Sequence, residues 1–248
     1  MEPTGSAQPP ARAGALEEEN RRLREELQQV LYVVSHDLQE PVRMVASYTQ
    51  LLQRRYAAQL DPTANEFIGF AVDGASRLSK MLAAILDISR VQTRGGEMRM
   101  VESARCLEEA RRQHAPALAA AGATLEAGLL PVVHADPAQL TRTFSTLIDN
   151  ALKFRRPDVP LHIRVEAEPA GAFRKFIVRD NGSGFPAEES GRLFRLFQRL
   201  VTRAEAPGIG AGLAWVRRVV ERHGGTLGAS GESGRGASVW FTLPALNS

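Results

Sequence analysis

The sequence predicts an α+β protein in which an N-terminal helical hairpin, paired with a second copy to form a dimeric four-helix bundle, precedes a two-layer α/β sandwich. Apolar residues recur at steps of three and four from residue 16 to about residue 91, as in two long amphipathic helices. Beyond residue 95, short apolar runs and Gly-rich turns alternate with shorter helical patterns. The run Thr93-Arg94-Gly95-Gly96 separates the two patterns and marks a domain boundary.

The N-terminal residues 1–14 are rich in Pro, Gly and Ala and carry almost no large apolar side chain. Burial therefore cannot offset the entropy lost on ordering them, and we expect a disordered tail. The chain divides accordingly into this tail, a coiled-coil and helical-hairpin domain over residues 15–94, and a sandwich domain over residues 95–248.

A narrow apolar stripe begins at Leu16 and is flanked by Glu and Arg residues, as in the seam of a short coiled coil; its members are Leu16, Asn20, Leu23, Leu27, Val30 and Val34. With Leu16 at a d position, Asn20 falls at an a position, where a buried Asn commonly sets the register and a two-stranded state. The stripe favours a homodimer, and a helix that packs within its own chain is the alternative.

The first helix is predicted to continue past His36, with a kink at Pro41, which removes a backbone donor. Asp61 and Pro62 fit the cap and first position of a second helix, which runs to about Val91. His36 lies off the apolar stripe, so its imidazole should face solvent beside Asp37. An exposed His beside an acid is a usable nucleophile, although a lone surface His is commonly only a solvated side chain.

The sandwich domain follows from a mixed series of short elements. We expect strands over residues 97–101, 123–127, 131–135, 161–167, 173–179, 226–229 and 237–243. Helices are expected over residues 106–121, 137–154, 188–194 and 211–222, the second of them capped by Asp136. Helices mixed with largely hairpin-connected strands predict two layers.

Three segments of this domain carry polar groups suited to a nucleotide. Asn150 and Lys153 share a helix face, and an Asn carbonyl suits Mg²⁺ while a Lys ammonium suits phosphate; a simple polar patch is the alternative. The turn Asp180-Asn-Gly-Ser-Gly follows an apolar strand and could offer a carboxylate to an exocyclic amine, or be an ordinary Asn-Gly turn. Residues 207–214 alternate three glycines before a helix and could bind phosphate, although no Lys closes a P-loop.

These motifs occur in the order of the H, N, G1, F and G2 boxes of two-component sensor histidine kinases, with the paired Phe194 and Phe197 as the F box. The chain resembles that family from about Leu31 to Leu243, and the Ser-His-Asp-Leu-Gln-Glu-Pro segment is most similar to bacterial phytochrome-type kinases. The second domain resembles the Bergerat ATP-binding fold shared with gyrase.

The resemblance implies a protein histidine kinase with ATP and Mg²⁺ as cofactors. It makes His36 the acceptor of the γ-phosphoryl group, with Asp37 orienting the imidazole and acting as its base. It implies that Asn150 binds Mg²⁺, that Lys153 binds the phosphates and that Asp180 binds the adenine amine. The remaining implied contacts are glycines, with Gly182 and Gly184 in the base pocket and Gly208, Gly210 and Gly212 in a mobile lid.

Two positions depart from the family pattern. Thr146 stands where many members carry a second Asn, and Glu40 stands where phosphatase-competent members often have Thr or Asn. Thr146 leaves open a catalytically weak phosphotransfer or scaffold protein with a degenerate ATP pocket. It also lacks the basicity of the Glu with which related ATPases activate water, which argues against a free-standing ATPase.

Partners and compartment follow partly from composition. The net charge is +3, and the basic residues are dispersed, so neither nucleic acid nor a membrane surface is expected as a partner. The single cysteine and the lack of a signal-peptide pattern predict a cytoplasmic protein. The resemblance implies a response-regulator receiver domain as the phosphoryl acceptor, and the signal would come from an upstream sensor protein or domain.

Overall fold

The computed structural model describes residues 10–200 and 208–245. It divides into two compact units, Met1–Ser89 and Arg90–Ser248. The predicted boundary, after Arg94, therefore lies a few residues later in the chain than the division found after Ser89. Within the described residues, no helix has the length and apolar character needed to cross a membrane.

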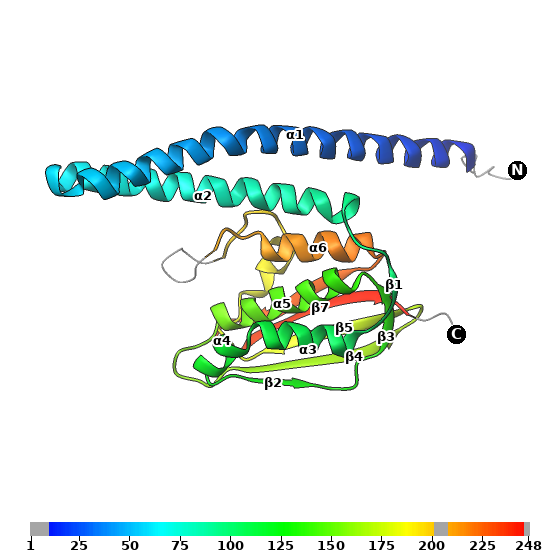
Figure 1. The fold of residues 1–248 in the computed structure, drawn as a ribbon. Coiled ribbons are helices and arrows are strands. Elements are labelled where there is room, and N and C mark those ends of the chain that lie inside the picture. The colour runs from blue at the N-terminus through cyan, green and yellow to red at the C-terminus, as the bar shows by residue number, and fades with distance from the viewer. Residues whose placement is uncertain (1–9, 201–207, 246–248) are drawn as a thin grey trace, which may run out of the picture. The chain divides into compact units, whose positions relative to one another are not determined.

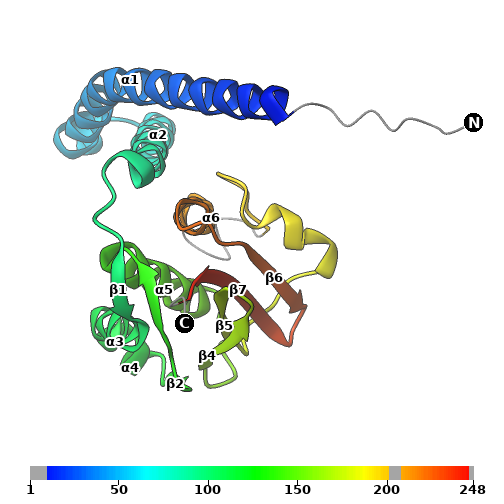
Figure 2. The same cartoon turned by 90° about the vertical axis from the view of Figure 1, so that its right-hand side faces the viewer.

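The N-terminal unit is a helical hairpin of α1 (Pro10–Tyr56) and α2 (Pro62–Thr93), joined by the 3₁₀ turn η1 (Ala57–Gln59) (Figure 1). Asp61 caps α2 as predicted, because its Oδ1 accepts a hydrogen bond from the Ala64 amide at 2.8 Å. The helix α1 continues through Pro41 without interruption, and Figure 2 shows its axis bending along its length.

The start of α1 differs from the prediction of a disordered tail over residues 1–14. The helix already begins at Pro10, and the predicted tail residues 1–9 lie outside the described residues. Proline is well suited to the first position of a helix, and the Ala and Arg residues that follow are good helix formers. Because a long helix is already nucleated, adding such residues at its end costs little.

The hairpin leaves many of its apolar residues exposed. Buried positions include Ser35 on α1 and Ala75, Leu82 and Leu86 on α2. Large exposed apolar side chains follow both helices: Val30, Val34, Leu38, Val45, Leu52, Phe67, Phe70 and Leu78. Leu16, Asn20 and Leu27, on which the predicted coiled-coil register depends, have side chains outside the described part of the chain.

The C-terminal unit contains a five-stranded sheet in the order β2-β4-β5-β7-β6. Its strands are β2 (Thr124–Ala127), β4 (His162–Ala170), β5 (Phe173–Asp180), β6 (Leu227–Glu232) and β7 (Gly236–Pro244). All neighbours are antiparallel except β2 and β4, which are parallel. A separate antiparallel pair joins β1 (Arg99–Glu102) to β3 (Val132–Ala135).

Helices cover one face of this sheet, as the predicted two-layer sandwich requires. They are α3 (Ser103–Gln113), α4 (Ala115–Ala120), α5 (Pro137–Lys153) and α6 (Gly212–Arg222), and the 3₁₀ helix η2 (Ala187–Arg192) lies in the connection after β5. Figures 1 and 2 both show α3, α5 and α6 on the same side of the sheet. Phe144 of α5 packs on Phe176 and Phe241, with ring centroids 5.9 and 5.8 Å away, so α5 forms the centre of the core.

Two helices differ in detail from the predictions. The segment predicted as one helix over residues 106–121 forms α3 and α4, which are separated at His114. Pro116 accounts for the break, because proline has no amide hydrogen to donate to the preceding turn. The segment predicted as a helix over residues 188–194 is the tighter η2, which begins and ends slightly earlier.

Candidate active site

His36 lies on α1 with 63% of its side chain exposed, as its position off the apolar stripe predicts. Its Nδ1 lies 3.2 Å from Oδ1 of Asp37, and its ring stacks near Tyr32 with 6.2 Å between centroids. The adjacent Ser35 is buried, so the helical rotation of about 100° per residue turns His36 outward. Because Asp37 engages Nδ1, the imidazole offers Nε2 for chemistry.

A hollow beside this histidine combines both helices of the hairpin. It is lined by His36, Asp37, Gln39, Glu40 and Arg43 of α1 and by Ser79 of α2. The residues one and two turns past His36 therefore share its surface, as residues four and seven apart do on a helix.

The C-terminal unit holds a cavity of about 330 Å³ in front of β5 and β7, beside α5 and the start of α6. It brings together most of the nucleotide-binding residues expected from the sequence: Asn150, Lys153, Asp180, Gly184, Gly208, Gly210 and Gly212. Gly182 does not line it but donates its amide to Oδ1 of Asp180 at 2.9 Å. Segments separated by about 60 residues of sequence therefore form one site.

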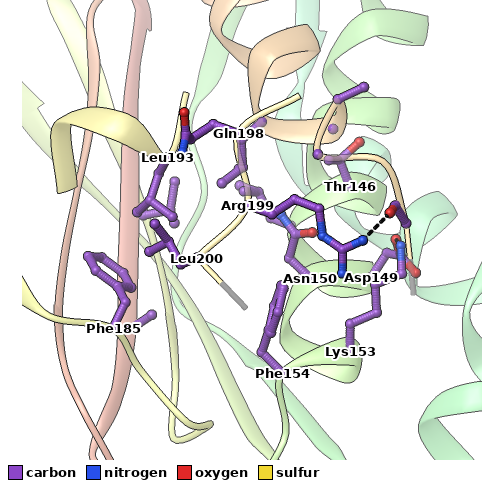
Figure 3. A pocket seen from close by; sticks show the side chains of 18 of the residues that line it. Thr146, Asp149, Asn150, Lys153, Phe154, Phe185, Leu193, Gln198, Arg199 and Leu200 are labelled. Atoms are coloured by element: carbon purple, nitrogen blue, oxygen red, sulfur yellow. Dashed lines mark hydrogen bonds and ion pairs between the residues drawn. The ribbon is translucent and has the colours of Figure 1, made fainter. Parts of the chain in front are cut away.

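The two sides of the cavity differ in polarity (Figure 3). Phe185, Leu193 and Leu200 lie on one side, and Asn150 and Lys153 lie on the other. Such a site suits a ligand with a flat apolar part and an anionic part.

Asp180 ends β5 and carries one of the two carboxylates that line the cavity, the other being that of Asp149. Burial raises the pKa of this carboxyl, while hydrogen bonds from the backbone of Gly182 and Ala237 lower it. The turn after Asp180 requires glycine at position 182, because a Cβ there would lie 2.5 Å from the carbonyl oxygen of Phe154. The fixed turn therefore holds the carboxylate in place with acceptor capacity left for a ligand.

The same turn also requires glycine at position 184, and the cost of replacing it can be measured. Its φ is +64°, and a Cβ there would overlap the carbonyl oxygen of Glu232. We expect Gly184→Ala to lower the free energy of unfolding by at least about 2 kcal/mol, because left-handed strain of roughly 1–2 kcal/mol adds to that overlap.

Gly171→Ala is the matched control for Gly184→Ala. Gly171 has nearly the same φ, +63°, but open space around the position of a Cβ. Thermal unfolding of both variants separates strain from overlap, and equal losses of stability would show that the close approach to Glu232 has no effect.

The polar end of the cavity is built on the last two turns of α5. Lys153 Nζ lies 2.5 Å from Oδ2 of Asp149. Asn150, the residue after Asp149, lines the same end of the cavity. Thr146, one turn earlier, donates its hydroxyl to the Arg142 carbonyl oxygen at 2.8 Å. The hydroxyl hydrogen of Thr146 is thereby used within α5, and only its oxygen lone pairs remain for a ligand.

The glycine loop enters the cavity from the start of α6. Gly208 and Gly210 have φ of +126° and +73°, and the carbonyl oxygen of Gly210 accepts the amide of Phe197 at 2.9 Å. Phe197 is the only non-glycine residue with positive φ among the described residues, so the backbone is constrained where the two motifs meet. Residues 201–207 between them lie outside the described part.

Arg199 is a residue of the cavity that we did not predict. Its Nη1 donates to the carbonyl oxygen of Gly208 at 2.7 Å, and its side chain reaches toward Asn150 (Figure 3). In the sequence, the only indication of its role is that this Arg stands two residues after Phe197, close to the glycine loop. The neighbouring residues do not determine where so long a side chain points. Arg199 adds a second cation to the end of the cavity that holds Lys153.

Comparisons with known families match both units. Residues 26–94 match the His Kinase A (phospho-acceptor) domain. Residues 135–247 match the Histidine kinase-, DNA gyrase B-, and HSP90-like ATPase domain. His36 falls in the first match, and every cavity residue described above falls in the second.

Relatives of this chain include cyanobacterial phytochromes. Cyanobacterial phytochrome A of Nostoc sp. is 42% identical over 219 residues, which cover 88% of this chain and 28% of that protein. Phytochrome-like protein Cph1 of Synechocystis sp. is 35% identical over 222 residues, which cover 90% of this chain and 30% of that protein. The chain thus spans less than a third of the length of these relatives.

Solved structures share the fold at lower identity. Full-length ShkA in complex with AMPPNP gives a TM-score of 0.61 at 24% identity, covering 87% of this chain and 45% of that one. Histidine kinase AdeS of Acinetobacter baumannii gives 0.56 at 18% identity, covering 86% and 98%. With both domains matched in the same order, the chain belongs to the two-component sensor histidine kinases and comprises their phospho-acceptor and ATP-binding catalytic core.

Proposed function

We propose that the chain is an ATP-dependent protein histidine kinase that autophosphorylates on His36 and passes the phosphoryl group to an Asp of a response-regulator receiver. The observation that carries this proposal is the cavity of the C-terminal unit, which combines the Asp180 carboxylate and apolar side chains with a polar end formed by Asn150, Arg199 and the Lys153–Asp149 ion pair. An adenine nucleotide has the complementary arrangement of a flat base with an amine and a polyanion.

Each end of the cavity has a role in binding this ligand. Asp180 accepts a hydrogen bond from the adenine amine, and Phe185 and Leu193 pack on the base. Lys153 and Arg199 neutralise phosphate charge, for which Lys153 exchanges its ion pair with Asp149 for a phosphate oxygen. The amides of the loop that contains Gly208, Gly210 and Gly212 can donate to the same oxygens at the start of α6.

The residues at this end also fit a magnesium ion. Mg²⁺ takes hard oxygen ligands and commonly uses one or two protein groups together with substrate phosphates and water. The side-chain oxygen of Asn150 is such a group, and it lies in the cavity beside Asp149. When bound with the nucleotide, the ion supplies charge neutralisation at the phosphates.

Phosphoryl transfer then requires a nucleophilic nitrogen. By holding Nδ1–H, Asp37 keeps the lone pair on Nε2 and stabilises the positive charge that develops on the ring. A bond forms from Nε2 to the γ-phosphorus while the bond from that phosphorus to the β,γ-bridging oxygen breaks. Asp37 accepts the Nδ1 proton as the ring charge is neutralised, which is its role as base.

The hairpin supports a homodimer as the active form. Its exposed apolar residues, among them Phe67 and Phe70 at 64% exposure each, need a partner surface, and two hairpins can close a four-helix bundle. The receiver would dock on this bundle near His36. We place the kinase in the cytoplasm, under the control of an upstream sensor protein or domain.

Two further findings favour a functional kinase over a weak phosphotransfer or scaffold protein. One of the solved structures that share the fold, that of ShkA, holds AMPPNP, an ATP analogue. In this chain, Asp180, Asn150 and Lys153 all line the cavity despite Thr146.

The proposed function is tested by incubating the chain with ATP labelled on the γ-phosphate and Mg²⁺. We expect label on the protein that is labile in acid and stable in alkali, absent when a chelator removes Mg²⁺, and transferable to a receiver domain from a panel. ATP labelled on the α-phosphate is the control and should leave the protein unlabelled. Steady release of phosphate with no labelled protein would instead indicate an ATPase.

A further inference from the structure

The segment that follows α2 is held by a cluster of polar side chains at the N-terminus of α5 and the C-terminus of α6. The last turn of α2 and the segment after it, residues 91–96, belong to the C-terminal unit. Asp136, Gln139 and Arg222 bind this segment, and we name these three residues the linker clamp. None of them lines the nucleotide cavity.

Arg222 connects all parts of the linker clamp. Its Nη1 donates to Asp136 Oδ2 at 3.1 Å and to Gln139 Oε1 at 2.9 Å, and its Nη2 donates to the Gly96 carbonyl oxygen at 2.8 Å. Its side chain is 15% exposed and that of Asp136 only 2%, so solvent screens these charge-assisted bonds little. A Cβ on Gly95 would overlap the guanidinium, which shows how closely the backbone passes it.

The other two residues fix both ends of the segment. Gln139 donates its amide to the carbonyl oxygen of Val91 at 3.0 Å, which provides a partner to a carbonyl near the C-terminus of α2. Asp136 Oδ2 accepts the Gly96 amide at 2.6 Å, while its Oδ1 caps α5. The path from Val91 to Gly96 is therefore fixed at both ends by buried side chains.

The same two helices reach the nucleotide cavity at their other ends. Asp136 caps the start of α5, which carries Asn150 and Lys153 in its last two turns, and α6 runs from Gly212 of the glycine loop to Arg222. With 17 and 11 residues, the helices are about 25 and 16 Å long. Rigid helices of this length can carry energetic coupling between their two ends.

We propose that the linker clamp positions the nucleotide site for phosphoryl transfer, with Arg222 and Gln139 as positioning residues that touch neither nucleotide nor His36. It couples the end of α2 to both helices that hold the nucleotide, so that a shift of α2 alters the placement of the γ-phosphate. The inference rests on the proposed kinase function. It assigns control of the transfer rate to residues outside the cavity.

The test compares Arg222→Lys with Arg217→Lys. Both residues lie on α6 and form ion pairs, but Arg217 is half exposed and bonds to Glu221. Lys keeps the charge of Arg222 and loses the forked geometry that reaches Asp136, Gln139 and Gly96 together. Gln139→Met is the second variant, because it keeps the length of the side chain and removes both of its hydrogen bonds.

We expect Arg222→Lys and Gln139→Met to lower the autophosphorylation rate at saturating ATP by about tenfold or more, because small misplacements of reacting groups are costly. The dissociation constant for an ATP analogue should change by less than about twofold, which separates positioning from binding. Transfer from phosphorylated His36 to a receiver and all properties of Arg217→Lys should match the unmodified chain. An unchanged rate, or an equal loss of nucleotide affinity, would overturn the proposal.

Hydrogen exchange gives a readout that requires no phosphoryl transfer. An ATP analogue should slow exchange of the Gly96 amide in the unmodified chain and in Arg217→Lys, and have no such effect in Arg222→Lys. If the kinase assignment is wrong, γ-labelled ATP will label none of the proteins, although the ATP analogue still slows exchange of the Gly96 amide in the unmodified chain. If the analogue slows this exchange equally in Arg222→Lys and in the unmodified chain, the proposal for the linker clamp is wrong, whatever the labelling shows.

Discussion

Replacing His36 by Gln should abolish labelling of the chain by γ-labelled ATP. Glutamine keeps a polar side chain of similar length but has no nitrogen lone pair that can accept a phosphoryl group. Because the side chain is 63% exposed, the change should leave the free energy of unfolding within about 0.5 kcal/mol. Nucleotide affinity should also be unchanged, since His36 does not line the cavity.

The control for this variant is His162→Gln. His162 is an exposed residue at the start of β4, hydrogen-bonded through Nδ1 to Thr124, and lies outside both sites. Its variant should be labelled like the unmodified chain. Full labelling of His36→Gln would reassign the phosphoryl acceptor to another residue, which mass spectrometry of the labelled peptide would identify.

Replacing Asp180 by Asn should weaken binding of every adenine nucleotide by about a hundredfold. Hydrogen bonds to charged groups contribute about 1.5–3 kcal/mol, and tenfold in affinity corresponds to about 1.4 kcal/mol. The Asn side chain can also turn its NH2 group toward the adenine amine. Because both groups are hydrogen-bond donors, this contact is unfavourable. Titration calorimetry with ATP, ADP and adenosine measures the loss, which should be similar for all three because the contact is to the base.

Asp149→Asn is the matched control, since it makes the same change at a second carboxylate of the cavity. Asp149 pairs with Lys153 at the phosphate end, so its variant should bind adenosine normally. An equal loss of adenosine affinity in both variants would contradict the assignment of Asp180 to the base.

The raised pKa of Asp180 adds a pH dependence to nucleotide binding. Burial favours the protonated carboxyl, so the group takes up a proton at a higher pH than an ordinary Asp, whose pKa is about 3.9. Adenosine affinity should therefore fall as the pH is lowered through this raised pKa, and the dependence should be absent in Asp180→Asn. Adenosine is the suitable probe, because it carries no phosphates that titrate.

The sequence alone determined the order of most helices and strands and the positions of the main motifs. The caps at Asp61 and Asp136 express local requirements, since each concerns a few neighbouring residues. The outward position of His36 follows equally from the period of one helix.

Only the tertiary structure decided which distant side chains meet. It placed Arg199 in the cavity, where its Nη1 donates to the carbonyl oxygen of Gly208, and it brought Arg222 to Asp136 across 86 residues of sequence. Periodicity and turn chemistry act over a few residues, whereas long side chains choose among many rotamers, and the choice is made by the surface that packing presents to them.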